Sequence, residues 1–290
     1  MNPKKRTIGN LILLLCAAVF LLSGGMLVHS YLLSAKEQSE FHLLSAQLKR
    51  TASVPSAVPT PYAESVEPTV EPAAATTGEP AAEPTAEPTP EAPPEILPQY
   101  AQLYAENKDL GGWVRIDGTV LDYPVMFTPE APERYLHRAF NGSKSFSGVP
   151  FVGEGSSLWP RSDNLILYGH HMQKGTMFAT IVKYKSESFW RKHPTIYFST
   201  LYDEGEYEIF AVFQTDIYHD SALRCYDFID AKDEADFDDY IARVRRASLY
   251  KTGVDVHYGD QLVTLSTCAY HTEDGRFVIV ARKATGDNDR

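Results

Sequence analysis

The sequence predicts a mostly β protein: a largely antiparallel barrel of about eight strands with added helices, preceded by a transmembrane helix and a disordered linker. Three observations lead to this prediction. An uncharged apolar run occupies the N-terminal region, and a Pro- and Glu-rich segment follows it. From residue 111 onward, short segments rich in Val, Ile, Tyr and Phe alternate with turn residues. Closing such strands into a barrel removes unpaired edges and gathers strand ends at a rim.

The apolar run extends from Thr7 to Ala35 without Asp, Glu, Lys or Arg, and exceeds the roughly 20 residues that cross a bilayer. Lys4, Lys5 and Arg6 precede it, so the positive-inside tendency leaves the N-terminus in the cytoplasm. A cleaved signal peptide is the alternative, although its apolar core usually spans only about 7–15 residues. We therefore expect residues 1–36 to form a single-pass anchor in the cell membrane, with the rest of the chain extracellular.

Residues 37–98 are predicted to form a juxtamembrane segment and a linker. From Thr51 to Pro98 the chain has twelve Pro, eight Glu and no Lys or Arg. This composition buries too little apolar surface to offset the entropy of ordering, and Pro favours extended conformations. At about 3.1 Å per residue the segment would reach roughly 150 Å, so we expect a spacer between the membrane and one globular domain, residues 99–290.

The elements expected in the globular part are short. Strands are predicted at 113–116, 120–127, 149–152, 164–168, 195–201, 206–217, 261–267 and 276–282. Helices are predicted at 99–107, 177–192 and 231–250. The last two helices carry apolar side chains at helical spacing, which is typical of core packing.

Charge and cysteine content exclude two classes of protein. The net charge is −11 and the globular part is acidic, so nucleic acid is not expected as a partner. Cys16 lies in the apolar run, and the remaining Cys225 and Cys268 are too few for a disulfide scaffold. We interpret Cys225 as a structural thiol. The residues alone leave open whether Cys268 is a nucleophile, a buried small side chain or the disulfide partner of Cys225.

Cys268 ends an apolar strand, and the strand that begins at Arg276 could return beside it as a hairpin. Arg276 would then lie near the thiol. A cation in that position can lower the thiol pKa or stabilise the oxyanion of an acyl-transfer intermediate.

A second strand end supplies histidine. The predicted strand 164–168 runs out at Gly169 and is followed by His170 and His171. A Cys/His pair is the minimum for acyl transfer by a thiol, because the imidazole must exchange a proton with the nucleophile and with the leaving amine.

Three motifs, in this combination, resemble the Cys, His and Arg motifs of sortases. They are TLSTC at 264–268, YGHHM-x-x-G-x-MF at 168–178 and RFVIVAR at 276–282. The stretches 112–125 and 140–148 and the long helix before the Cys strand resemble class B sortases in particular. The resemblance covers about residues 99–283.

The resemblance implies that Cys268 is the nucleophile, His170 the acid/base partner and Arg276 the oxyanion stabiliser. His170 is preferred over His171 because it directly follows the Tyr-Gly pair of the motif. It is preferred over His271 because a residue three positions past the thiol is more often a loop group than a positioned base.

Arg282 is the rival of Arg276, but six residues along one strand put it about 20 Å farther from the thiol. We expect four further residues to line the approaches to the site as substrate-binding residues. These are Tyr168, Thr267, Ser266 and Asn164.

The activity implied by the resemblance is that of a cysteine transpeptidase. It would cleave a C-terminal sorting signal of the Pro-x-Thr kind in secreted proteins, after Thr. Through a thioacyl intermediate it would join the acyl group to an amine of a peptidoglycan precursor or of a surface protein such as a pilin. No metal or organic cofactor is required. Two alternatives stay open: a secreted cysteine peptidase that only hydrolyses, and a non-catalytic wall-binding ectodomain on a membrane stalk.

Overall fold

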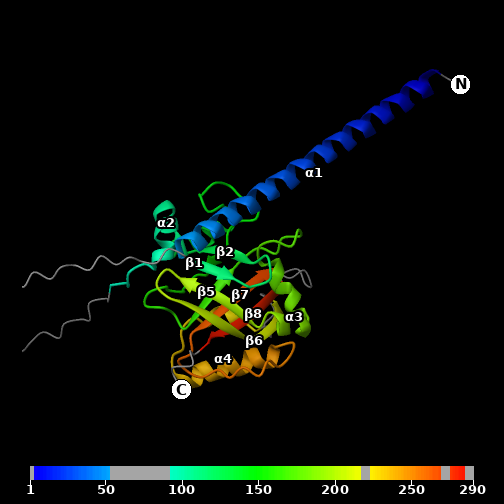
Figure 1. Ribbon diagram of the computed structural model, residues 1–290. Coiled ribbons are helices and arrows are strands. Elements are labelled where there is room, and N and C mark those ends of the chain that lie inside the picture. Colours follow the sequence, from blue (N-terminus) through cyan, green and yellow to red (C-terminus); the bar gives the residue numbers. More distant parts are fainter. Residues whose placement is uncertain (1–2, 53–91, 217–222, 269–274, 285–290) are drawn as a thin grey trace, which may run out of the picture.

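Eight strands close into a barrel in the computed structural model, which describes residues 3–52, 92–216, 223–268 and 275–284 (Figure 1). Around the barrel the order is β1-β2-β3-β4-β7-β8-β6-β5, which confirms the predicted architecture. The strands are β1 Leu110–Arg115, β2 Asp122–Met126, β3 Phe151–Val152, β4 Asn164–Tyr168, β5 Thr195–Thr200, β6 Glu204–Asp216, β7 Leu262–Cys268 and β8 Gly275–Lys283. The helices are α1 Pro3–Ala52, α2 Pro98–Glu106, α3 Glu187–Lys192 and α4 Glu234–Ala247, with the 3₁₀ helices η1 Pro132–Tyr135, η2 Phe178–Lys185 and η3 Cys225–Asp227.

Most neighbouring strands are antiparallel, as expected, but β2 with β3 and β4 with β7 run parallel. The β4–β7 pair extends from Asn164 opposite Leu262 to Tyr168 opposite Ser266. The next pair, β7 with β8, is the antiparallel hairpin that the sequence predicts. The carboxyl ends of β4 and β7 and the amino end of β8 therefore meet at one rim of the barrel.

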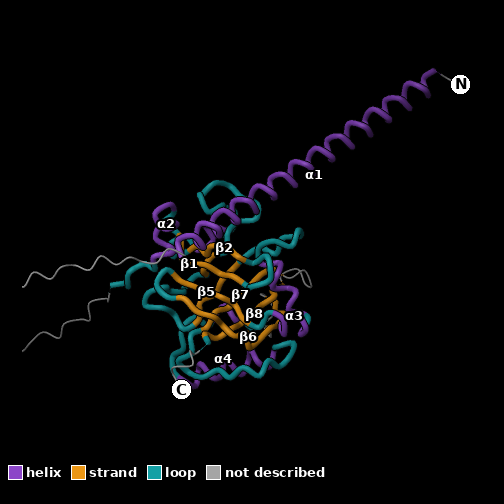
Figure 2. Tube along the Cα trace, viewed as in Figure 1, coloured by secondary structure: helices purple, strands orange, loops and turns teal. Residues whose placement is uncertain are grey.

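Both faces of β8 are buried, which explains its continuous apolar run. Phe277 and Ile279 belong to the core inside the barrel, whereas Val278 and Val280 pack outward in the layer beneath α4. This alternation follows from the two-residue period of a strand. Figure 2 shows α4 on the side of the strands opposite the point where α1 leaves them.

The apolar stripe of α4 faces that outer layer. Its buried residues recur at the spacing of one helical face: Phe237, Tyr240, Ile241 and Val244. The side chain of Asp233 accepts a hydrogen bond from the backbone N–H of Asp236 at 2.9 Å. This cap satisfies one of the free donors at the start of the helix.

The single helix predicted at 177–192 is instead two elements, η2 and α3. The large buried apolar side chains of η2 recur at every third position, which matches the three residues per turn of a 3₁₀ helix. They are Phe178, Ile181 and Tyr184. In the sequence, Phe178 and Ile181 also fit one face of an α-helix together with Val182, Phe189 and Trp190, which explains the prediction of a single helix.

The first part of α1 is apolar and exposed. Among the described residues, α1 is the helix long and apolar enough to cross a membrane. Its large apolar side chains from Leu13 to Leu33 are exposed, and this part projects away from the barrel (Figure 1). The length and composition of the helix fit the predicted membrane anchor.

The later part of α1 packs on the barrel. Phe41 and Leu48 are buried in the main core, and the Phe41 ring meets the Tyr123 ring edge-on with 5.1 Å between centroids. Ser45 donates a hydrogen bond to the carboxylate of Asp122 on β2 at 2.6 Å. The helix thus binds the domain before the Pro- and Glu-rich segment begins.

This docking places the barrel close to the end of the apolar run. Glu37 is buried against the domain only four residues after Leu33, a distance of about 6 Å along the helix. The barrel therefore lies beside the end of the apolar run, whatever the length of the linker. The predicted disorder of that linker concerns residues 53–91, which lie outside the described part of the chain.

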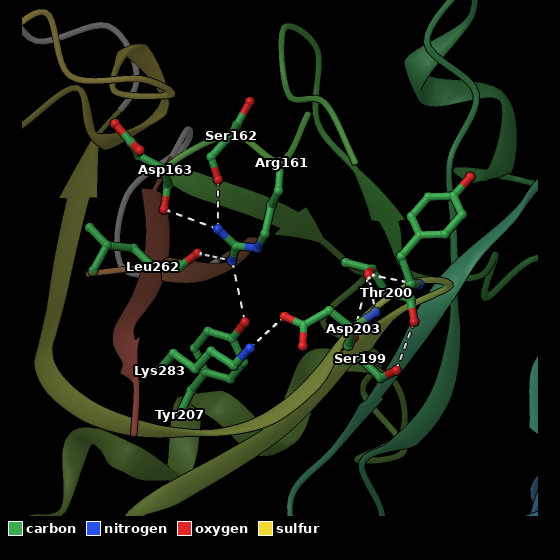
Figure 3. A network of polar contacts seen from close by, with 10 residues as sticks. Arg161, Ser162, Asp163, Ser199, Thr200, Asp203, Tyr207, Leu262 and Lys283 are labelled. Carbon is green, nitrogen blue, oxygen red and sulfur yellow. Dashed lines mark hydrogen bonds and ion pairs between the residues drawn. The ribbon is translucent and has the colours of Figure 1, made fainter. Parts of the chain in front are cut away.

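Arg161 holds the amino ends of β4 and β7 together (Figure 3). Its guanidinium donates to the carbonyl oxygens of Ser162 at 2.6 Å and Leu262 at 2.8 Å, and to the Tyr207 hydroxyl at 3.3 Å. Parallel strands share no tight turn that could set their register. A side chain that binds both strand ends fixes the register instead.

We predict that Arg161→Met lowers the free energy of unfolding by about 2 kcal/mol, because it leaves the buried carbonyl of Leu262 without this donor. Urea unfolding of the full chain in detergent, followed by Trp fluorescence, measures the change. Arg246→Met, at an exposed position on α4, is the control and should change the free energy by less than about 0.5 kcal/mol. Equal losses in the two variants would contradict the role of Arg161.

Candidate active site

Cys268 and Arg276 are register partners at the turn end of the β7–β8 hairpin. Partners of this kind in an antiparallel pair have Cα atoms about 4.5–5.5 Å apart. The structure describes Cys268 by its backbone alone. Arg276 is half-buried, and its guanidinium donates to the carbonyl oxygen of Gly275 at 3.2 Å. A strand end thus carries the candidate nucleophile and a cation side by side.

His170 lies at the same rim, just beyond the end of β4. The ladder between β4 and β7 continues past Tyr168, because the Gly169 N–H donates to the carbonyl of Ser266 at 3.3 Å. In addition, the Thr267 hydroxyl donates to the carbonyl oxygen of Gly169 at 2.6 Å. His170 and Cys268 each follow this last pair by one residue. The structure therefore brings His170, Cys268 and Arg276 to neighbouring strand ends.

Two residues of the loop formed by residues 136–148 contact the imidazole of His170. Nε2 donates to the carbonyl oxygen of Leu136 at 2.9 Å, since a carbonyl can only accept. The His137 ring stacks on the His170 ring with 5.3 Å between centroids. Burial lowers the pKa of His170 below its ordinary 6.5; the Leu136 hydrogen bond opposes this shift, and His137 adds to it. The imidazole is consequently neutral in most molecules at pH 7.

The loop that carries His170 is shaped by its glycines and by Phe178. A Cβ at Gly169 would lie 2.6 Å from the Phe178 ring, so only glycine allows the ring to pack there. Phe178 N–H also donates to the carbonyl of His170 at 3.0 Å. Gly175 has φ +82°, the left-handed conformation that favours glycine, and turns the chain back toward Phe178. The Gly and Phe positions of the motif are therefore explained by packing and turn geometry.

Three of the four predicted substrate-binding residues lie at the rim. Tyr168 is half-buried and packs against Phe151, whereas Ser266 and Thr267 are buried. The Thr267 hydroxyl donates to the carbonyl of Gly169, so this side chain contacts the backbone of the residue before His170.

The fourth predicted substrate-binding residue, Asn164, is at the opposite end of β4. Its amide donates to the carbonyl of Phe228 at 2.8 Å and accepts from the Thr264 hydroxyl at 2.9 Å. The structure does not bring Asn164 to the other candidates, because four residues of an extended strand separate it from Tyr168 by about 13 Å.

The rival residues have other positions. Arg282 stands opposite Leu262 at the far end of the hairpin and pairs with Glu208 at 2.7 Å. His171 forms an isolated bridge with Met177 within the loop. His271 and the side chain of Cys225 lie outside the described residues, so the structural role predicted for Cys225 stays a prediction.

Sequence reasoning missed Leu136 and His137. Both lie in an irregular segment about 34 residues before His170, with no strand or helix period that would mark them. Leu136 acts through its backbone carbonyl, which no side-chain pattern reveals. The only sequence signal is that a histidine, His137, stands just before the class B stretch at 140–148.

Known proteins share this arrangement of strands. Residues 114–284 match the family model described as the sortase domain. The chain belongs to the sortase family. Sortase B of Listeria monocytogenes is 34% identical over 183 residues, which cover 62% of this chain and 71% of that protein. A Staphylococcus aureus sortase B–substrate complex superposes with a TM-score of 0.67 at 24% identity, over 88% of this chain and all of that one. A sortase B structure complexed with triglycine gives 0.59 at 31% identity, over 65% and 87%.

This sortase is of class B, and its activity is that of a sortase-type cysteine transpeptidase. Among the described residues, no group of three or more His, Cys, Asp or Glu side chains is arranged to hold a metal ion. The described site places a titratable imidazole, His170, and a cation, Arg276, at neighbouring strand ends.

We predict that Gly169→Ala lowers the free energy of unfolding of this sortase by about 2 kcal/mol, because the new methyl group overlaps the buried Phe178 ring. Chemical denaturation of the full chain in detergent measures the change. In the Phe178→Leu background the same substitution should be much less costly, because leucine leaves space for the methyl group. Equal costs in the two backgrounds would show that the Phe178 ring is not the obstacle.

We predict that His137→Gln raises the pKa of His170 while leaving it below 6.5, because the variant removes the smaller cause of the shift and keeps the burial. An NMR titration of imidazole protons in the Cys268→Ala background measures it without a titrating thiol nearby. His257→Gln, at an exposed position, is the control. A lower or unchanged pKa in the His137 variant would disagree with this account.

Proposed function

We propose that this sortase cleaves a Pro-x-Thr sorting signal of secreted proteins after Thr and transfers the acyl group to an amine. Cys268 is the nucleophile, His170 the acid/base residue and Arg276 the oxyanion stabiliser. The observation that carries the proposal is the strand register, since it supports a meeting of these three residues at one rim. Arg282 and Asn164 lie at the other end of the same strands.

In the first half-reaction the thiolate of Cys268 attacks the carbonyl carbon of the Thr residue, forming a C–S bond. The carbonyl oxygen becomes an oxyanion, which the Arg276 guanidinium stabilises. The imidazolium of His170 then gives its proton to the departing amine as the C–N bond breaks. The lowered pKa of His170 makes the imidazolium a minor species at pH 7 but a stronger acid, which suits protonation of a poor leaving group.

In the second half-reaction an amine attacks the thioester. Neutral His170 takes the proton of the incoming amine, a new C–N bond forms, and the C–S bond breaks to release the Cys268 thiolate. Water in place of the amine gives hydrolysis. The enzyme therefore returns to its starting state with no net change in protons or electrons.

The substrates proposed are a sorting signal and an amine of a peptidoglycan precursor or of a surface protein such as a pilin. One similar structure, 31% identical, is a sortase B complex with triglycine, which supports a peptide amine as a substrate for this chain. The further substrate-binding residues proposed at the rim are Tyr168, Ser266 and Thr267.

We place residues 1–36 as the cytoplasmic N-terminus and membrane anchor, 37–98 as the juxtamembrane segment and linker, and 99–290 as the catalytic domain. The basic residues before the apolar run favour an extracellular domain. The cell wall of a Gram-positive bacterium is the setting that this arrangement suits.

The test is mass spectrometry of the full chain in lipid nanodiscs, incubated with Pro-x-Thr peptides and triglycine. We expect cleavage after Thr, a thioester adduct on Cys268 and an amide product that grows with triglycine concentration. Cys268→Ala should abolish all three. His170→Ala should lower kcat/KM by about 10²- to 10⁴-fold and Arg276→Lys by about 10²- to 10³-fold.

Arg282→Lys is the matched control for Arg276→Lys and should leave kcat/KM within about twofold, because the substitution keeps the charge beside Glu208 at the far end of the hairpin. Hydrolysis that exceeds amide formation at every triglycine concentration would favour the peptidase alternative. No adduct and no cleavage across the peptide panel would favour the binding-domain alternative.

A further inference from the structure

Glu37 on α1 is a buried carboxylate, 9% exposed, bound entirely by one short segment of the 136–148 loop. Its Oε1 accepts hydrogen bonds from the Ser145 hydroxyl at 2.8 Å and from the Phe146 N–H at 3.2 Å. Its Oε2 accepts from the Ser147 hydroxyl at 2.6 Å. Hydrogen bonds to a charged acceptor are stronger than neutral ones, so α1 holds this arm of the loop firmly.

The arm that Glu37 binds is joined to the arm that contacts His170. The Ser145 N–H donates to the carbonyl of His137 at 3.1 Å. Gly148 approaches the Leu136 carbonyl so closely that a Cβ there would lie 2.4 Å from the oxygen. The Leu136 carbonyl and the His137 ring of this loop contact the imidazole. A continuous set of contacts therefore leads from Glu37 to His170.

α1 also supports the loop that carries His170. The Tyr123 hydroxyl accepts from the Met177 N–H at 3.2 Å and donates to the side-chain oxygen of Gln38 at 3.5 Å. Lys174, on the same loop, donates to the carbonyl of Ser30 at 3.2 Å. One helix thus supports both the loop that carries His170 and the loop that contacts its imidazole.

We propose that the juxtamembrane part of α1 belongs to the scaffold of the active site, and that Glu37 is a positioning residue that acts on His170 through the 136–148 loop. The inference rests on the proposed role of His170. The segment next to the membrane anchor then has two roles. It attaches the domain, and it affects the rate of the chemical step.

The base of the loop has separate supports, so loss of Glu37 loosens one arm without unfolding the whole. The Tyr135 hydroxyl donates to Asp109 at 2.9 Å and accepts from Asn107 at 2.8 Å. What Glu37 adds is a fixed position for residues 145–148, and hence for the groups that hold the imidazole. Displacing a catalytic group by about 1 Å can lower a rate by about 10²-fold.

The test compares variants of the full chain in lipid nanodiscs, well below their unfolding temperatures. Glu37→Ala should lower kcat by about 10- to 100-fold and leave KM within about twofold, because the peptide-binding rim is intact. Hydrogen exchange of the peptide that spans residues 136–148 should become faster. Glu37→Gln should recover most of kcat, since its amide oxygen still accepts from Ser145 and Phe146 and the Ser147 hydroxyl can accept from its NH₂ group.

Two controls separate positioning from stability. Glu40→Ala removes a carboxylate three residues along the same helix, where the side chain is 41% exposed and paired only loosely with Lys36 at 3.9 Å; kcat should not change. Leu48→Ala weakens the docked helix at a position away from the loop. It should lower the unfolding temperature while leaving kcat within about twofold.

An unchanged kcat in Glu37→Ala would overturn the inference, and so would an equal fall in kcat in Leu48→Ala. Should Glu37→Ala prove too unstable to assay, Ser147→Ala tests the same contact by removing one donor, and it should lower kcat by a smaller factor. Retention of full activity in His170→Ala would instead overturn the proposed function. That result is independent of the Glu37 variants.

Discussion

The parallel pairing of β4 with β7 is the constraint on which the active site depends. The antiparallel pairing of β7 with β8 by itself places Cys268 opposite Arg276. His170 comes from a strand about a hundred residues earlier and reaches the rim only because β4 and β7 run in the same direction and end together. Two kinds of contact maintain that alignment: Arg161 at the amino ends, and Thr267 with Gly169 at the carboxyl ends. A slip of one residue would move every side chain of β4 to the opposite face.

The fold, and the meeting of His170, Cys268 and Arg276 at neighbouring strand ends, could be predicted from the sequence because their signals are local. Short segments rich in Val, Ile, Tyr and Phe between turn residues mark the strands, and Gly169 and Cys268 stand where apolar runs end. The parts that could not be predicted depend on contacts between distant segments. The Leu136 carbonyl carries no side-chain signal. Asn164 lies on the strand that leads to His170, and only its hydrogen bonds to Phe228 and Thr264 show that it lies at the opposite end of the barrel. The three-residue spacing within 178–184 fits an α-helix and a 3₁₀ helix equally well over two turns.

The juxtamembrane part of α1 is the clearest case of a role that composition cannot reveal. In the sequence, Glu37 is one charged residue among several after the apolar run, and a charged residue there is ordinarily solvated. In the structure it is buried because Ser145, Phe146 and Ser147 supply three donors to its carboxylate. Burying a carboxylate is unfavourable without such partners. The contact therefore requires both the acid on α1 and the donors on the 136–148 loop. The docked part of α1 therefore holds the domain next to the end of the apolar run.

The unbroken path of α1 from its apolar run into the docked segment also affects how the enzyme meets its substrates. With the apolar run in a bilayer, the catalytic rim stays at one height above the lipid surface and cannot sample the space that a long tether would allow. The search for a membrane-attached protein becomes lateral diffusion in a plane, where local surface density replaces bulk concentration. Under the proposed function, a sorting signal would then be selected by the distance of its scissile bond from the membrane, as well as by its sequence.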